Sequence, residues 1–186
     1  MSAYSWVETL VASQVDGSAL TNTTTATSIL PASSKIILPA GFIDRLGKGL
    51  RIRASGRVSN VVTTPGTLTL DVRFGSTTVF TGGAMNLNAT AQTNATWELD
   101  LELLARAVGT SASLLGVGSW RSRSVVGSVA AASGGVGTLL LPDTAPAAGT
   151  TFDSTQSQTV DLFATWSIAN ASNSITLHNF TIQALN

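Results

Sequence analysis

Apolar residues alternate with polar residues along most of this 186-residue chain. Side chains that repeat every second residue lie on one face of a β-strand, so each alternating run predicts a strand with one buried face. The parity of the apolar positions changes after Leu177 in the last run, and we expect a β-bulge near His178 or Asn179 to restore the facing. The five clearest runs cover residues 50–58, 68–74, 97–103, 159–168 and 174–183.

Glycine and proline mark the turns between these runs. Residues 64–66 contain Pro65 and Gly66, and residues 74–76 form a tight hairpin around Gly75. Helical spacing occurs over residues 40–46, where Gly47 stops the pattern. About eight to ten strands with one short helical turn predict an all-β protein, an antiparallel jelly-roll β-sandwich.

An extended N-terminal arm precedes the sandwich in this interpretation. We assign residues 1–39 to the arm, because Pro31 and Pro39 interrupt long strand pairing there, and residues 40–186 to the sandwich. The arm is polar and Thr-rich, with too few apolar residues for a core of its own, so we expect much of it to be mobile until a partner orders it. Two long loops, 121–137 and 142–157, are rich in Gly, Ala, Ser and Pro, and loops of this length tend to be functional or mobile.

Charge is sparse and balanced along the chain. Charged residues make up 11% of it, below the roughly 25% of an average soluble domain. Ten Lys and Arg against ten Asp and Glu give zero net charge, which disfavours nucleic acid and anionic membranes as partners. No apolar run approaches the roughly 20 residues of a membrane span, and residues 1–15 lack the pattern of a secretory signal. A neutral surface suits an assembled subunit better than a monomer, so we expect an oligomer.

Three carboxylates, Glu98, Asp100 and Glu102, occupy one face of a predicted strand. Such a row has two chemical interpretations, a glycosidase pair or a calcium site. Carboxylates two residues apart on a strand stand about 7 Å apart in a line, however, with no converging loop ligands. The plainer interpretation pairs this acidic row with a basic row on a neighbouring strand or subunit, where the pairs would set register. The basic row comprises Arg51, Arg53 and Arg57, with Arg73 as a further candidate.

Groups that carry catalysis are few. The chain has no cysteine, which excludes disulfides and thiolate metal sites. Its one imidazole, His178, would have to serve any hydrolytic triad, and nothing in the sequence marks a nucleophile for it. We therefore expect a non-enzymatic protein with no catalytic residue, no metal and no cofactor.

Aromatic residues supply candidates for partner contacts. Trp97 and Trp166 lie on inward faces of predicted strands, whereas Trp6 and Trp120 lie outside the long alternating runs. Because aromatic side chains are enriched at interfaces, we assign the second pair to contacts with a partner. In the arm, such contacts would accompany the addition of a strand to a neighbouring chain. The predicted contact residues are Tyr4, Trp6, Val7 and Trp120.

Three stretches of sequence carry a family resemblance, and they read GKGLRIRASGRVSNVVTTPGTLTLDVRFGSTTVF (47–80), TNATWELDLELLARAVGT (93–110) and FDSTQSQTVDLFATWSIANASNSITLHNF (152–180). The chain resembles tailed-bacteriophage virion proteins over about residues 7–186, with a jelly-roll body similar to those of capsid decoration proteins and tail-spike or fibre domains. The resemblance implies a homotrimer with a structural role. It implies a decoration or cement protein that binds the major capsid protein on the head exterior. The alternative is a tail-associated fibre or receptor-binding domain, whose partners are tail proteins or a host surface glycan.

Overall fold

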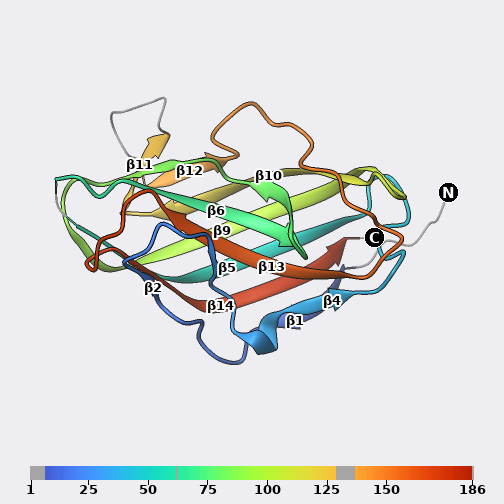
Figure 1. Cartoon of the computed structure of the whole chain (residues 1–186), viewed down its shortest axis with the longest axis horizontal. Helices are drawn as coiled ribbons and strands as arrows, with labels where there is room; N and C mark the ends of the chain where they lie inside the picture. Colours follow the sequence, from blue (N-terminus) through green and yellow to red (C-terminus); the bar gives the residue numbers. More distant parts are fainter. Residues whose placement is uncertain (1–6, 62, 129–136, 186) are drawn as a thin grey trace.

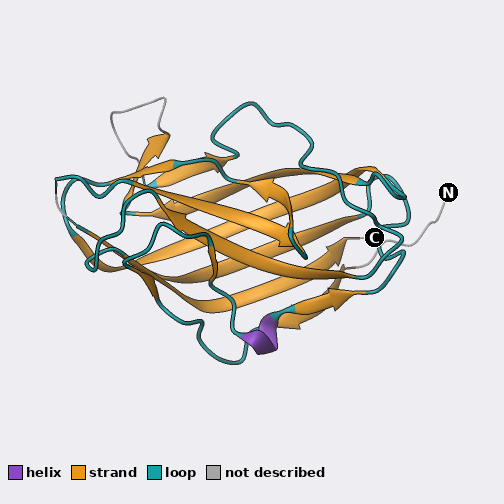
Figure 2. Cartoon of the chain, viewed as in Figure 1, coloured by secondary structure: helices purple, strands orange, loops and turns teal. Residues whose placement is uncertain are grey.

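The computed structural model of the chain describes residues 7–61, 63–128 and 137–185. Two antiparallel sheets pack face to face, which confirms the predicted all-β class (Figure 2). Sheet A comprises β1 (Val7–Ala12), β2 (Leu20–Thr21), β5 (Gly49–Asn60), β9 (Gln92–Ala107), β10 (Ser113–Ser122), β12 (Thr138–Leu141) and β14 (Ser174–Leu185). Its strand order is β1-β14-β5-β9-β10-β12, and β2 also pairs with β14.

Sheet B comprises β3 (Thr27–Ser28), β4 (Ile36–Leu38), β6 (Thr67–Phe74), β7 (Thr77–Thr81), β8 (Met85–Leu87), β11 (Val125–Ser128) and β13 (Gln158–Trp166). Its order is β11-β8-β6-β13-β3, with β4 also paired to β13 and β7 to β6. Strands β6 and β13 cross obliquely over β5 and β9 of the other sheet (Figure 1). This is the geometry expected of two twisted sheets that share one core.

The five alternating runs of the sequence all form long strands, which are β5, β6, β9, β13 and β14. In β9, for example, Leu99, Leu101 and Leu103 are buried between the sheets, and the residues between them face outward. The predicted bulge in the last strand is also present, because the register of β14 against β5 shifts between Leu177 and Asn179. Alternation alone was therefore enough to locate these five long strands.

The N-terminal arm is part of the sandwich over its described residues. Strands β1 and β2 extend sheet A beside β14, and β3 and β4 extend sheet B beside β13. Leu20, Ile29 and Leu38 of the arm are buried in the common core. We expected the arm to lack a core of its own, and its apolar side chains join the core of the sandwich. Pro31 and Pro39 do interrupt the arm, but Leu20 of β2, Leu38 of β4 and Ile29, which follows β3, still lie in the gap between the sheets.

A buried carboxylate fixes the arm to sheet B. Asp161 of β13 accepts a hydrogen bond of 2.6 Å from the Ser28 hydroxyl and forms an ion pair of 2.6 Å with the Lys35 ammonium group. Its side chain is largely buried, and its Oδ1 also accepts a hydrogen bond from the backbone N–H of Leu162. Ser28 and Lys35 thus hold both ends of the arm's second half on β13.

The helical turn predicted over residues 40–46 is wrong, because this segment consists of turns and bends. Gly41 and Gly47 adopt φ angles of 73° and 79°, in the left-handed region that ends a right-handed helix. Ile43 is nevertheless buried, which accounts for the apolar spacing that suggested a helix. Within the described residues the helical element is η1, a single 3₁₀ turn at Ala32–Ser34. No helix in the described part of the chain is long and apolar enough to cross a membrane.

The loop 142–157 is tied to sheet A along its length. Isolated bridges join Ala148 to Leu115 and Phe152 to Ala112. Phe152 is buried, and its ring lies edge-on to that of Phe74 with centroids 5.0 Å apart. This loop therefore covers one end of the sandwich and belongs to the core. In the other long loop, residues 121–137, residues 129–136 lie outside the described part.

Candidate functional site

The outer face of sheet A carries rows of polar and charged side chains that run across its strands. Residues of β5 and β9 face each other in register, with Arg51 opposite Glu102, Arg53 opposite Asp100 and Ser55 opposite Glu98. The residues between them along each strand are buried, so these six side chains must point away from the core. The structure thus places the predicted acidic and basic rows side by side on one face.

Asp100 is the centre of the ion pairs on this face. The Arg51 guanidinium donates two hydrogen bonds to it, from Nε to Oδ1 at 2.9 Å and from Nη2 to Oδ2 at 2.7 Å. Arg53 adds a contact of 3.4 Å from its Nε to Asp100 Oδ2. These hydrogen bonds from Arg51 lower the pKa of Asp100, and the same bonds raise the pKa of Arg51. All three side chains are partly exposed, so solvent screening keeps the energetic effect small.

The other members of the two rows form no ion pair with a described residue. Arg57 lies opposite Thr96, one row beyond the carboxylates. Glu102 lies between Arg51 on β5 and Val117 on β10, and its charge raises the pKa of Arg51 in addition to the larger effect of Asp100. Glu98 lies between Ser55 on β5 and Arg121 on β10. Arg73, the further candidate, lies on sheet B, where it contacts Asp71 at 3.7 Å and stacks over the Phe163 ring.

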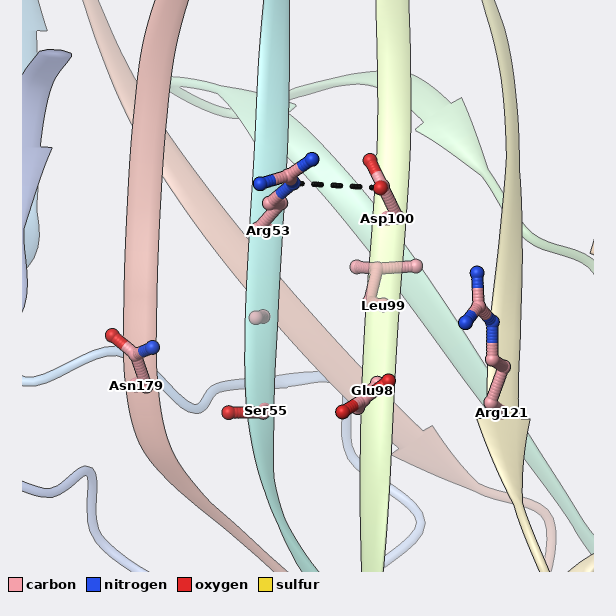
Figure 3. A pocket seen from close by; sticks show the side chains of 8 residues that line it. Arg53, Ser55, Glu98, Leu99, Asp100, Arg121 and Asn179 are labelled. Carbon is pink, nitrogen blue, oxygen red and sulfur yellow. Dashed lines mark ion pairs between the residues drawn. The ribbon is translucent and has the colours of Figure 1, made fainter.

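A hollow of about 290 Å³ lies in this face, centred on the row that contains Ser55 and Glu98 (Figure 3). Ser55 is short while Arg53 and Arg121 beside it are long, so the surface recedes at the serine. The hollow spans four strands, because Asn179 of β14 lies opposite Ser55 in the same row. Its lining comprises Arg53, Ala54, Ser55, Glu98, Leu99, Asp100, Arg121 and Asn179.

Three of these lining residues escaped the sequence analysis, namely Ser55, Arg121 and Asn179. Each belongs to a different strand from the acidic row on β9. Ser55 alternates with the apolar positions of β5, which marks it as outward-facing, but parity does not say which strands are neighbours. The order β14-β5-β9-β10 supplies that information, and nothing in a single sequence encodes it directly.

The carboxylate row does not form a metal centre in the described part of the chain, where no three His, Asp or Glu side chains converge as ligands. Both oxygens of Asp100 already accept hydrogen bonds from Arg51, which leaves the middle member of the row poorly suited to bind calcium or to act as a catalytic acid. His178 lies at the bulge of β14 and contacts Asp16 of the arm, with Nδ1 2.9 Å from Oδ2. Its position indicates a role in attaching the arm.

Trp120 was predicted to contact a partner, and the structure shows this prediction to be wrong, because its side chain is fully buried. It lies opposite Leu99 in register and points into the core with it. Gly116 and Gly118 occupy the two preceding inward positions of β10 and hide the alternation that would have revealed this. A side chain at Gly116 would collide with the Phe80 ring, which fills that space.

The remaining predicted contacts lie at the start of the chain. Val7 begins β1 at the edge of sheet A, and 60% of its surface is exposed. Tyr4 and Trp6 lie outside the described residues. At the opposite edge of the same sheet, Leu140 of β12 is 73% exposed, and Val117 of β10 lies on the same outer face. Both edges of sheet A therefore present apolar side chains to solvent.

Comparison of the chain with family models, with curated proteins and with solved structures gives no match.

Proposed function

We propose that the chain is a structural subunit of a tailed-bacteriophage virion, a non-enzymatic homotrimer that decorates the head exterior by binding the major capsid protein. The observation that carries this proposal is the position of β1 at the edge of sheet A. This strand pairs with β14 on one side, and no described strand covers its other side. An edge strand offers a row of unpaired backbone donors and acceptors to an incoming strand.

Val7, the first residue of β1, lies where such a strand would be added. The exposed Val7 side chain supplies an apolar contact beside the unpaired backbone. Residues 1–6 precede Val7 in the sequence and include Tyr4 and Trp6, which would supply aromatic anchors. Attachment through this edge leaves the core of the sandwich unchanged, as expected of a subunit that folds before it joins a particle.

A jelly-roll connection is the finer form of the fold in this proposal. The pairing of β5 with β14 and of β6 with β13 joins early strands of the sandwich to late ones. In a jelly roll, one long antiparallel hairpin folds over to form two sheets. The strands at the two ends of that hairpin therefore pair with each other, as β5 and β14 do here. The weakly charged exterior adds support, because an assembled subunit tolerates a neutral surface that provides little repulsion between free molecules.

Particle binding by two matched variants tests the proposal. Purified protein is incubated with particles of the encoding phage that lack it, and bound protein is measured after sedimentation. Removal of residues 1–6 together with Val7→Glu should lower occupancy about tenfold or more, because it removes the anchors and charges the edge. Val15→Glu is the control, since Val15 is similarly exposed but lies outside β1. Equal occupancy by both variants would place attachment elsewhere.

The polar hollow favours a second candidate, a tail-associated fibre or receptor-binding domain. Hydrogen-bonding side chains from four adjacent strands meet there on an open face, as a host surface glycan requires. The two candidates differ in copy number, because decoration proteins cover a head in hundreds of copies and tail tips carry a handful. Quantifying the chain in purified particles separates them.

A further inference from the structure

The hollow of sheet A contains one guanidinium and one carboxylate that have no partner in the described structure. Arg121 and Glu98 lie opposite each other in register on β10 and β9, yet they form neither an ion pair nor a hydrogen bond. The other charges that line the hollow are satisfied, because Asp100 binds both Arg51 and Arg53. Figure 3 shows the Arg121 side chain running along β10 and the Glu98 carboxylate lying over β9 on the Ser55 side. The space between and around these two groups is open.

The size and polarity of this space restrict its ligand. Its volume of about 290 Å³ is at the lower end of small-molecule sites, which suits a ligand of about one sugar ring. The side chains that reach the surface here are charged or hydrogen-bonding, since Ala54 and Leu99 turn theirs into the core. An apolar ligand would therefore gain little, and a hydrophilic one would find a donor or acceptor on each strand.

The positions of the hydrogen-bond donors and acceptors restrict the ligand further. A guanidinium binds a carboxylate through two parallel hydrogen bonds, and Arg121 is the group free to do so. Glu98 accepts hydrogen bonds from hydroxyl groups, and Asn179 both donates and accepts, about two strand spacings or 10 Å away across the row. A ligand dense in phosphate is disfavoured, because Glu98 and Asp100 would repel it. A neutral sugar would leave Arg121 without a partner.

We propose that this hollow binds a sugar that carries a single carboxylate, with Arg121 holding the carboxylate and Glu98 and Ser55 holding hydroxyl groups. The binding site goes beyond the proposed role in the virion and does not depend on it. Uronic acids and other acidic sugars of cell-surface polysaccharides have this chemistry.

Titration of the full-length protein with D-glucuronate, followed by calorimetry or by amide chemical shifts, tests this inference. Glucuronate should bind saturably, and glucose and acetate should each bind about tenfold more weakly, because each lacks half of the recognised groups. Arg121→Gln should weaken glucuronate binding about tenfold, and Ser55→Ala should weaken it by a smaller factor. Arg57→Gln is the matched control, because Arg57 is an exposed arginine of the same face outside the hollow.

Each alternative outcome overturns the inference. If glucuronate shows no saturable binding, the hollow is not a binding site for it. If acetate binds as tightly as glucuronate, the hollow does not recognise the hydroxyl groups of a sugar. If Arg57→Gln weakens glucuronate binding as much as Arg121→Gln does, the effect is a general attraction between charges and not binding in the hollow. If glucuronate fails to bind while Arg121→Gln lowers particle occupancy, the hollow contacts protein and the sugar proposal fails. The virion proposal is judged separately, from the content of purified particles.

Discussion

Arg51 donates two hydrogen bonds to Asp100, although the register of β5 and β9 places Arg53 opposite Asp100 and Arg51 opposite Glu102. The long arginine side chain reaches its diagonal neighbour, where both of its donors meet both carboxylate oxygens. Asp100 is thereby shared between two arginines, and Glu102, which lies opposite Arg51, forms no ion pair with a described residue. Glu98 lies between Ser55 and Arg121 in register and likewise forms no ion pair within the described residues.

The Arg51–Asp100 pair should make stability depend on pH in the acid range. Its hydrogen bonds hold the pKa of Asp100 below the ordinary value of 3.8, so the unfolded chain binds this proton at higher pH than the folded chain does. The stabilisation is therefore fully present above about pH 4 and is lost as the pH falls through the folded pKa. Asp100→Asn should lower the free energy of unfolding by about 0.2–1 kcal/mol at neutral pH.

Urea denaturation at a series of pH values measures this effect. The difference between wild type and Asp100→Asn should shrink below about pH 4. Glu98→Gln is the control on the same strand face, and it should cost less at neutral pH because Glu98 forms no ion pair with a described residue. Equal costs for the two variants at neutral pH would show that the ion pair contributes nothing.

Trp97 and Trp120 should respond differently to replacement by phenylalanine. Both are fully buried, so the loss of apolar volume is the same. The Trp97 indole N–H donates to the backbone carbonyls of Arg57 and Thr176, at 3.2 and 3.3 Å, whereas that of Trp120 meets no acceptor in the described part of the chain. Trp97→Phe should therefore destabilise the protein by about 1 kcal/mol more than Trp120→Phe in denaturation experiments. The reverse order would mean that Trp120 has an acceptor.

Asp161 should hold the second half of the arm on sheet B. Asp161→Ala removes the partner of the Ser28 hydroxyl and of the Lys35 ammonium group, and it should cost about 1–3 kcal/mol. Hydrogen exchange should increase over residues 27–38. Asp153→Ala is a useful comparison, because Asp153 accepts hydrogen bonds from Thr155 within its own loop and should leave exchange in the arm unchanged. Unchanged exchange over 27–38 in Asp161→Ala would show that the strands β3 and β4 hold the arm unaided.

The purified protein should be a homotrimer. Leu140 of β12 and Val117 of β10 expose apolar side chains at the edge of sheet A opposite β1, and closed cyclic symmetry would bury this surface between subunits. Light scattering after size-exclusion chromatography should give about three times the chain mass of 19.0 kDa. A monomer at micromolar concentration would argue strongly against this assembly.

The sequence predicted the long strands because their signal is local. In β5, β6, β9, β13 and β14 every second residue is apolar, and the bulge in β14 appears as a break in parity. In β10 the same signal fails, because Gly116 and Gly118 fill inward positions without an apolar side chain, and Trp120 consequently appeared isolated. The contribution of the arm to the common core was not predicted for a related reason, since Leu20 and Ile29 are spaced too widely to form a pattern.

The candidate site was only half predictable. The acidic and basic rows are visible because each occupies alternate positions of one strand, and a row of opposite charge suggests an adjacent strand. Which strands flank them depends on the order of sheet A, and this order brings Asn179 and Arg121 from distant parts of the chain to Glu98. The diagonal choice of Arg51 depends on side-chain reach, which strand parity does not describe.

The most direct test of the virion proposal is the number of copies of the chain in purified particles of the encoding phage. Mass spectrometry with isotope-labelled reference peptides, scaled to the major capsid protein, gives this number. The proposal predicts hundreds of copies per particle, in a multiple of three. A handful of copies would assign the chain to the tail, and its absence from purified particles would contradict a structural role in the virion.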